Sequence, residues 1–373
     1  MRCAHPREEW SVIRSVTFPK QYWYPVCRSK DLRRKPVAIT MMDEPLAVFR
    51  DAGGSPRVVL DRCPHRNAAL SDGRVADDGC IECPYHGWRF DGDGSCRAVP
   101  GLYEGDAATA TARNVSWHAA TERDGFVWVW GAAGEDPTRE PFAMPDLLHS
   151  EHASKPRKNW QVGEVIFPCD LDATLHAALE NTLDVPHTAF LHKGIFRGKR
   201  LKELTAERTD FDGGVEVEFI GEPVGLGPIQ GGPFAKKTFK HWDRFVMPCV
   251  AQVEYRVDDW LEIFNNVIHV PLSPTVTRAW FVFRWWTPLP ARLLAPIVAA
   301  QGRLVLRQDK QAMAQQSKNI ERFGGERFAS TDLDLLGAAI WRLLRQAEKA
   351  EDRQASALDD TLTEGATNLR FRA

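Results

Sequence analysis

No stretch of this sequence is both long enough and apolar enough to cross a bilayer. The longest uncharged apolar run of the C-terminal half, Leu293 to Gly302, is interrupted by Pro296, whereas a membrane helix needs about 20 apolar residues. The segment Met1 to Trp10 has no apolar core after its basic residues, so it does not resemble a secretory signal. We therefore expect a soluble, cytoplasmic protein with no membrane partner.

The chain also lacks an excess of charge of either sign. It has 48 basic and 50 acidic residues, which gives a formal net charge of −2. Composition therefore predicts no nucleic-acid partner and leaves small-molecule chemistry open. A G-x-G-x-x-G fingerprint is missing as well, so we expect no flavin or nicotinamide site of that type.

The length of the chain predicts two domains. With 373 residues, of which 43% are hydrophobic, it carries more apolar material than a single typical core needs. A Pro-containing linker at 134–145 separates two regions of different character. We place an N-terminal extension at residues 1–21, a first domain at 22–133 and a second domain at 134–373.

The first domain contains short runs that are typical of β-strands. Runs beginning at Pro36, Leu46, Arg57 and Gly125 are rich in β-branched and aromatic residues, and Gly, Pro, Asp and Asn separate them. The sequence Asp-Gly-Asp-Gly at 91–94 predicts a hairpin turn, because both glycines tolerate positive φ. These patterns indicate a small all-β domain.

The second domain mixes helical and strand periodicities. Residues 169–191 and 304–322 show helical spacing of apolar residues, whereas 215–220 and 245–282 are typical of strands. The polar tail after Ala350 shows neither pattern, and we expect it to be loosely held. The second domain is therefore predicted to be α+β.

Two short loops of the first domain each offer one cysteine and one histidine, Cys63-Pro-His65 and Cys83-Pro-Tyr-His86. Two thiolates and two imidazoles can hold a tetrahedral zinc ion. They are also the ligand set of a Rieske [2Fe-2S] centre, in which two cysteines bind one iron and two histidines bind the other. The spacing alone does not exclude zinc, although the tight proline and glycine context is unlike that of a zinc finger. The other cysteines match no ligand position and are expected to be ordinary thiols: Cys3, Cys27, Cys80, Cys96, Cys169 and Cys249.

The second domain carries a further cluster around two histidines. Asp184 precedes His187 by three residues, and His192 follows after five. Five residues of an ideal helix turn by about 500°, which leaves the two rings about 140° apart. The helix must therefore bend or end near Pro186 for both imidazoles to reach one metal ion.

Both clusters resemble those of the Rieske non-haem iron oxygenases. The resemblance is carried by Arg62-Cys-Pro-His-Arg-Asn-Ala-Ala-Leu-Ser, by Cys83-Pro-Tyr-His-Gly-Trp-Arg-Phe-Asp-Gly and by the N-x-x-D-x-x-H-x-x-x-x-H pattern that runs from Asn181 to His192. Around the first two stretches, the resemblance covers most of residues 22–131. The pattern Tyr-Trp-Tyr-Pro-Val from Tyr22 and the short second domain are most similar to the single-subunit branch that includes vanillate O-demethylase.

This resemblance implies a fold and a set of metal ligands. The fold would be an α+β two-domain structure with an N-terminal all-β Rieske domain and a C-terminal α+β helix-grip (START-like) catalytic domain. Cys63 and Cys83 would hold the inner iron of the [2Fe-2S] cluster, and His65 and His86 the outer iron. A mononuclear Fe(II) that activates O2 would be bound by His187, His192 and a carboxylate of a later helix.

Asp309 is our choice for that carboxylate, because Arg307-Gln-Asp-Lys-Gln resembles the ligand helix of the family. Asp332 and Asp334 are the alternatives, in a segment that is predicted to be extended or turn-like. Asn181 and Asp184 fall on the family's catalytic signature. The resemblance implies that Asp184 links His187 to His86 of a neighbouring chain in a head-to-tail trimer, and the alternative is that Asp184 only orients its own helix.

The electrons would come from a reductase, with or without a ferredoxin, as the resemblance implies. A basic run follows the ligand segment and consists of Lys193, Arg197, Lys199, Arg200 and Lys202. It could dock an acidic partner or attract an anionic substrate, although such runs are more often solvated loops.

The substrate is the point at which the sequence becomes uninformative. We expect monooxygenation of an aromatic or heterocyclic small molecule, by hydroxylation, by O- or N-demethylation or by oxidation of an aromatic amine. The aromatic strand Trp280 to Trp286 and the polar residues Asn265, Asn266 and His269 could line the pocket, with core packing as the alternative. The competing function classes are a non-catalytic Rieske electron-transfer protein and a zinc-binding structural module.

Overall fold

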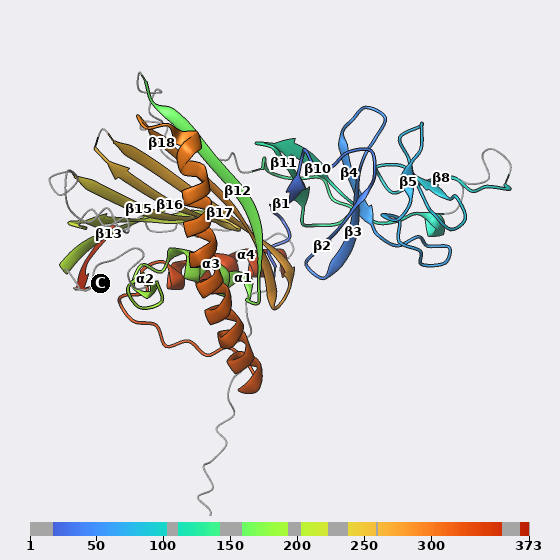
Figure 1. Ribbon diagram of the computed structural model, residues 1–373. Coiled ribbons are helices and arrows are strands. Elements are labelled where there is room, and N and C mark those ends of the chain that lie inside the picture. The colour runs from blue at the N-terminus through green and yellow to red at the C-terminus, as the bar shows by residue number, and fades with distance from the viewer. Residues whose placement is uncertain are drawn as a thin grey trace, which may run out of the picture.

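The computed structural model describes residues 18–102, 111–141, 159–192, 203–222, 238–258, 260–352 and 366–372. Figure 1 shows two bodies side by side, one built from small sheets and one from a large curved sheet with helices across one face. The first body contains the described residues up to 141 and the second those from 159 onward. The prediction of an all-β domain followed by an α+β domain is confirmed.

The N-terminal body consists of three small antiparallel sheets. One sheet has the order β1-β11-β10, the second β2-β3-β4-β9 and the third β5-β6-β7-β8. The bounds are β1 Trp23–Arg28, β2 Val37–Met41, β3 Glu44–Arg50, β4 Pro56–Leu60, β5 Arg74–Val75, β6 Ile81–Glu82, β7 Arg89–Phe90, β8 Cys96–Ala98, β9 Trp117–His118, β10 Ala120–Arg123 and β11 Phe126–Trp130, with a 3-10 turn at Thr111–Arg113. The strands that the sequence predicts near Pro36, Leu46, Arg57 and Gly125 are thus present.

The hairpin turn predicted at 91–94 connects β7 to β8, but its two glycines serve different purposes. Gly94 has φ 74°, as predicted. Gly92 is not in the positive-φ region, and a Cβ there would lie 2.4 Å from Cδ of Arg57. The predicted turn is therefore present, with Gly94 in the left-handed conformation and Gly92 allowing the close approach of Arg57.

The C-terminal body is organised by one eight-stranded antiparallel sheet with the order β12-β18-β17-β16-β15-β14-β13-β19. Its strands are β12 Gln161–Leu171, β13 Glu203–Phe211, β14 Gly214–Ile220, β15 Phe239–Val246, β16 Val250–Val257, β17 Leu261–Ser273, β18 Val276–Thr287 and β19 Ala366–Arg372. The helices are α1 Leu175–Leu183, α2 His187–Phe190, α3 Ala291–Arg322 and α4 Gly337–Asp352. Long α3 crosses the sheet face in Figure 1.

Three secondary-structure predictions are corrected in this body. Residues 169–171 belong to strand β12, so the helical segment begins only at Leu175. Helix α3 begins at Ala291 and includes Pro296, so it is longer than the predicted 304–322. Residues 366–372 of the polar tail form strand β19 along β13, so this part of the tail is not loosely held.

The two bodies are joined by backbone and side-chain contacts. The N–H groups of Met42 and Asp43 donate to the carbonyls of Pro271 and Leu272, both at 2.8 Å. Phe126 meets Trp280 edge to face at a centroid distance of 5.2 Å. No helix of the described residues is long and apolar enough to span a membrane.

Candidate metal centres and substrate pocket

The four residues of the first cluster lie on two loops that are closed in the same way. Cys63 N–H donates to the carbonyl of Ala68 at 2.8 Å, and Cys83 N–H donates to that of Trp88 at 2.8 Å. Four residues after each cysteine the backbone is left-handed, with φ 62° at Asn67 and φ 70° at Gly87. Asn and Gly are the residue types that tolerate this conformation best. The two loops therefore present a cysteine and a histidine each.

The side chains of these four residues lie close together, as expected for the ligands of one metal cluster. The rings of His65 and His86 are 4.5 Å apart between centroids. Both Cys63 and Cys83 are buried, and Nδ1 of His65 is buried without a hydrogen-bond partner among the described residues. Burial raises the pKa of the Cys63 thiol to about 11, with the neighbouring Cys83 adding to it. A buried pair of thiols beside an unsatisfied imidazole nitrogen fits a metal cluster, which would neutralise the thiolates.

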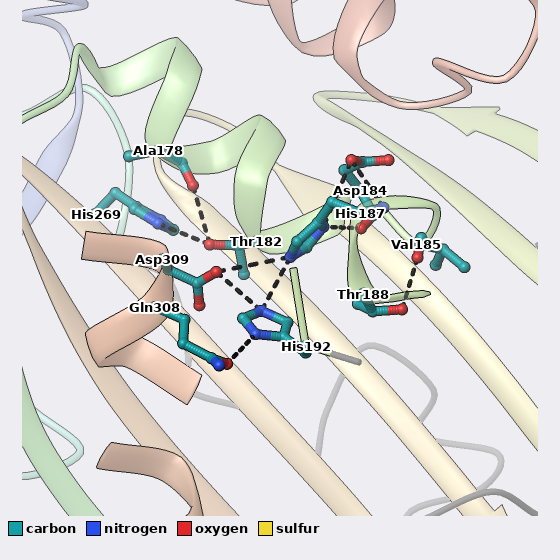
Figure 2. A network of polar contacts seen from close by, with 10 residues as sticks. All are labelled: Ala178, Thr182, Asp184, Val185, His187, Thr188, His192, His269, Gln308 and Asp309. Atoms are coloured by element: carbon teal, nitrogen blue, oxygen red, sulfur yellow. Dashed lines mark hydrogen bonds and ion pairs between the residues drawn. The ribbon is translucent and has the colours of Figure 1, made fainter. Parts of the chain in front are cut away.

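The second cluster brings His187, His192 and Asp309 to one point (Figure 2). Nε2 of His187 and Nε2 of His192 are 3.3 Å apart. Oδ1 of Asp309 lies 2.9 Å from Nε2 of His192 and 3.7 Å from Nε2 of His187. Three ligands about 2.1 Å from a metal and at right angles to one another would be about 3 Å apart. The triangle therefore fits a two-histidine-one-carboxylate site.

The helix is broken near Pro186, as predicted, but this break precedes both histidines, and His192 is separated from His187 by the end of α2 at Phe190. Helix α1 ends at Leu183, and α2 begins at His187 directly after Pro186. Asp309 reaches the site from the middle of α3. Its Oδ1 is buried and lies 2.9 Å from Nε2 of His192, so this oxygen is directed at the point where an ion would bind.

The other nitrogen of each imidazole is held by the protein. Nδ1 of His187 hydrogen-bonds to the backbone carbonyl of Asp184, and Nδ1 of His192 lies 2.9 Å from Oε1 of Gln308. A carbonyl oxygen only accepts, so both Nδ1 atoms donate and both Nε2 atoms keep their lone pairs. Burial lowers the pKa of His192, but the nearby carboxylate of Asp309 and the amide oxygen of Gln308 outweigh it and hold this pKa above its usual value. Sequence reasoning missed Gln308, although it directly precedes Asp309.

Asp184 ends helix α1 and also contacts His187. It is the C-cap residue of α1, and its carboxylate Oδ2 accepts the backbone N–H of His187 at 3.3 Å and lies 3.4 Å from Nδ1 of that ring. Its side chain is 34% exposed. The imidazole hydrogen bond thus goes to the backbone of Asp184, and the carboxylate stays accessible from outside.

The remaining candidates are distributed as follows. Asn181 lines both the cavity beside the metal cluster and a smaller one that also includes Asp184 and Asp334. Asp334 accepts from the backbone N–H of Thr331, and among the described residues the metal-binding cluster includes neither Asp332 nor Asp334. The basic run Lys193, Arg197, Lys199, Arg200 and Lys202 lies outside the described residues, as does Cys3. The five described cysteines that match no ligand position are not in disulfides, in line with the prediction of ordinary thiols: Cys27, Cys80, Cys96, Cys169 and Cys249.

A largely apolar cavity of about 420 Å³ adjoins the metal cluster, between the sheet and helices α1, α2 and α3. The aromatic strand contributes alternate residues to it, namely Phe281, Phe283 and Trp285, whereas Trp280 packs on the N-terminal body. Asn265 lines the cavity, but Asn266 accepts from Gln252 on the other face of the sheet. His269 is fully buried, with Nε2 3.2 Å from the hydroxyl of Thr182. Of the three polar candidates, only Asn265 faces the cavity directly.

Two protein families match successive parts of the chain. The Rieske [2Fe-2S] domain matches residues 22–111, and the vanillate O-demethylase oxygenase C-terminal domain matches residues 171–350. The oxygenase component of dicamba O-demethylase from Stenotrophomonas maltophilia is 31% identical over 203 residues, which are 54% of this chain and 56% of that protein. The chain thus spans about half the length of this relative.

A second relative is similar over nearly its whole length. The vanillate O-demethylase oxygenase subunit from Pseudomonas sp. (strain HR199 / DSM 7063) is 25% identical over 363 residues, which are 91% of this chain and 98% of the relative. Among solved structures, dicamba monooxygenase bound to dicamba superposes with a TM-score of 0.70 at 24% identity, covering 91% of this chain and all of the other. This structural likeness establishes the shared fold.

Proposed function

The chain belongs to the Rieske oxygenases related to vanillate O-demethylase, whose [2Fe-2S] and catalytic domains it contains, and we propose that it oxidises an aromatic or heterocyclic small molecule with O2. The reaction is a monooxygenation, with O- or N-demethylation as the leading possibility and hydroxylation as the other. The observation that carries the proposal is the convergence of His187, His192 and Asp309 beside an apolar cavity of about 420 Å³. A cavity of this size suits a ligand with one or two rings.

Each part of the site has a separate task in this proposal. His187, His192 and Asp309 would hold the mononuclear iron beside the cavity. When bound, that iron supplies the activation of O2. Gln308 and Asp184 fix the two imidazoles at Nδ1, so that Nε2 is the ligand atom of each ring. The apolar residues of the cavity exclude water from the reacting centre.

Cys63, His65, Cys83 and His86 would hold a Rieske cluster, which would supply electrons from a reductase or ferredoxin partner to the catalytic site. In Figure 1 the β5–β8 end of the N-terminal body, where these loops lie, points away from α1, α2 and α3. His86 is exposed there, and so is the carboxylate of Asp184 beside the catalytic centre. This supports transfer between chains of a head-to-tail trimer, in which Asp184 of one chain meets the Rieske loops of its neighbour.

Metal analysis and product formation test this function together. The purified protein should contain cluster iron and sulfide plus one further iron, and should release formaldehyde from aromatic methyl ethers or N-methyl compounds in the presence of a reductase. His187→Ala should retain the cluster spectrum while losing the extra iron and turnover, whereas Cys83→Ser should lose the cluster spectrum. A protein with a cluster but without mononuclear iron would instead be an electron-transfer protein, and a colourless zinc protein would be a structural module.

A further inference from the structure

A second, smaller cavity adjoins helix α1. Its volume is about 210 Å³, and its acidic lining residues are Glu180, Asp184 and Asp334. Gln316 and Leu333 line it as well, and both side chains are exposed, so this cavity opens to solvent. It is large enough to hold several water molecules, and its carboxyl groups are suitable hydrogen-bond partners for them.

Helix α1 forms a shared wall between this cavity and the larger one beside the metal-binding cluster. Successive residues of a helix differ in direction by about 100°. Glu180 therefore lines only the smaller cavity, Thr182 lines only the larger one, and Asn181 between them lines both. Val185 also lines both cavities but is apolar. Asn181 is thus the polar link between the cavity that opens to solvent and the candidate catalytic site.

The carboxyl group of Glu180 has a fixed place beside this link. A Cβ at Gly337, the first residue of α4, would lie 2.1 Å from its Oε1, so the glycine makes room for the carboxyl group. Within the described part of the chain, this carboxyl group makes no hydrogen bond or ion pair. Burial, and then the charges of Asp334, Asp184 and Glu326, raise its pKa to about 7. Both of its protonation states are therefore populated at neutral pH.

The neighbouring helices do not reverse this effect. His176, one turn earlier in α1, is buried, and burial lowers the pKa of its imidazole, so it is neutral at pH 7. Arg342 and Arg345 of α4 each have a carboxylate partner of their own. The proton affinity of Glu180 is thus set by its burial and by the surrounding carboxylates.

The proposed reaction consumes protons as well as electrons. For a methyl ether, one molecule each of substrate and O2, two electrons and two protons give the phenol, formaldehyde and water. The methyl carbon is oxidised, its bond to the ether oxygen breaks, and O2 is reduced by the electrons that the reductase supplies. The larger cavity is largely apolar, and apolar walls do not conduct protons. The reaction therefore needs a polar route from solvent.

We propose that Glu180 is a proton-relay residue, which takes protons from solvent in the smaller cavity and passes them along Asn181 to the reacting centre in the larger one. This inference rests on the proposed function and identifies the proton source of that reaction. In each transfer the carboxyl group of Glu180 releases one proton inward, and its carboxylate is protonated again from solvent. The amide of Asn181 does not titrate and only provides hydrogen bonds along the route.

The variant Glu180→Gln preserves the shape of the side chain but cannot release a proton. We expect its turnover at saturating substrate to fall on the order of tenfold to a hundredfold, with cluster and mononuclear iron contents unchanged. Glu180→Asp keeps an acid and should retain part of the rate. Glu207→Gln, at an exposed position of β13, is the control and should turn over like the parent.

Three further measurements distinguish a relay from a structural role. Acetic acid or imidazolium, added as a small proton donor, should accelerate Glu180→Gln but not the parent. Turnover of the parent should fall as pH rises through about 7, because the donor is then ionised, and Glu180→Gln should lack this fall. The infrared difference between parent and Glu180→Gln should show a protonated carboxyl band that disappears over the same pH range, and this measurement requires no turnover.

Parental turnover in Glu180→Gln would overturn the inference. So would a slow Glu180→Gln that neither small acids nor the aspartate variant improve, or a carboxyl band that does not change with pH. If Glu180→Gln does not fold, the comparison of the pH profiles of the parent and Glu180→Asp takes its place, and identical profiles count against the relay. Failure of the proposed function is a different result: the parent itself would release no formaldehyde, while the infrared titration of Glu180 would still be measurable.

Discussion

Gln308 holds the imidazole of His192 in the tautomer that a metal site needs. Its Oε1 accepts from Nδ1 at 2.9 Å, which leaves Nε2 free to bind. Gln308→Leu should therefore weaken binding of Fe(II) at the mononuclear site about 10-fold to 100-fold, measured by titrating iron-free protein. Gln315→Leu, at an exposed position of the same helix, is the control. Equal affinity in both variants would mean that Gln308 has no role in orienting the ring.

The sequence pattern predicted the three residues of the metal-binding cluster, but it did not predict Gln308, which orients one of them. His187, His192 and Asp309 are chemically distinctive and occur in recognisable patterns, so their meeting point could be predicted. Gln308 offers only an amide, and amides occur throughout the chain. The buried imidazole of His241 shows the same limit: Asp243 lies two residues along the chain on the same strand face, but Glu222, whose carboxylate is 2.7 Å from Nδ1 of His241, is 19 residues away in sequence.

Glu180 is a buried carboxylate whose ionisation opposes folding. Burial raises its pKa to about 7, and the nearby charges of Asp334, Asp184 and Glu326 add to this. Because the folded pKa lies above the ordinary value of 4.5, the stabilising effect of the protonated form is complete at low pH and is lost as pH rises from about 4.5 to about 7. The ionised carboxylate of Glu180 therefore destabilises the folded protein at neutral pH.

Glu180→Gln should therefore be more stable than the parent at pH 8, by about 1–2 kcal/mol after allowance for partial exposure. The gain should shrink toward pH 5, where the parent carboxyl is largely protonated. Thermal unfolding at both pH values measures it, with the exposed Glu207→Gln as control. A gain of equal size at both pH values would indicate a packing effect instead of a charge effect.

Helix α1 positions the segment that carries the two histidines, and its start is fixed by a side-chain cap. The hydroxyl of Thr174 accepts the N–H of Ala177 at 3.2 Å. Thr174→Ala should lower stability by about 1 kcal/mol, whereas Thr174→Ser keeps the acceptor and should lower it much less. Both variants lack the γ-methyl group of threonine, and only Thr174→Ala also lacks the capping hydroxyl. The difference between their unfolding temperatures therefore measures the contribution of the cap.

The elements that sequence patterns failed to predict are those whose form depends on distant parts of the chain. Residues 169–171 have helix-like spacing, but they pair with Thr277 to Ala279 of β18 and continue a strand of eleven residues. Helix α3 begins thirteen residues before the predicted Leu304 and passes through Pro296, because the apolar residues on either side of this proline pack against Ile263 and Trp285 of the sheet. Strand β19 gains its partner only when β13 is already in the sheet.

At the scale of the whole molecule, the two metal centres belong to bodies that lie side by side, with the Rieske loops at the far end of one of them. Tyr85 beside His86 is 66% exposed, so the loop tip presents an aromatic surface that can dock. Asp184 is exposed next to His187. These positions favour electron transfer between neighbouring chains over transfer within one.

The variant Asp184→Asn tests whether the Asp184 carboxylate takes part in electron transfer between chains, because it removes the charge and preserves the size of the side chain. Both metal contents, the oligomeric state and the cluster spectrum should stay near those of the parent. Reoxidation of the reduced cluster by O2 and substrate should slow strongly, because the variant lacks the negative charge that we propose links His187 to His86 of a neighbouring chain. Rapid mixing of pre-reduced protein with O2 and substrate measures this rate. Unchanged reoxidation would leave Asp184 with only its helix-capping role.

A mixture of two inactive variants tests whether electrons pass between chains or within one chain. Cys83→Ser has no cluster but keeps the catalytic residues, whereas His187→Ala keeps the cluster residues but cannot hold the mononuclear iron. If each centre received electrons from its own chain, no combination of the two could turn over. In a head-to-tail trimer, a mixed assembly brings the intact Rieske loops of a His187→Ala chain against the intact catalytic site of a Cys83→Ser chain. Co-expression with two different affinity tags, followed by tandem purification, should therefore restore a clear fraction of parental formaldehyde release. Mixing the separately purified variants without exchange of chains should restore none, and a mixed trimer that stays inactive would show that electrons do not cross between chains.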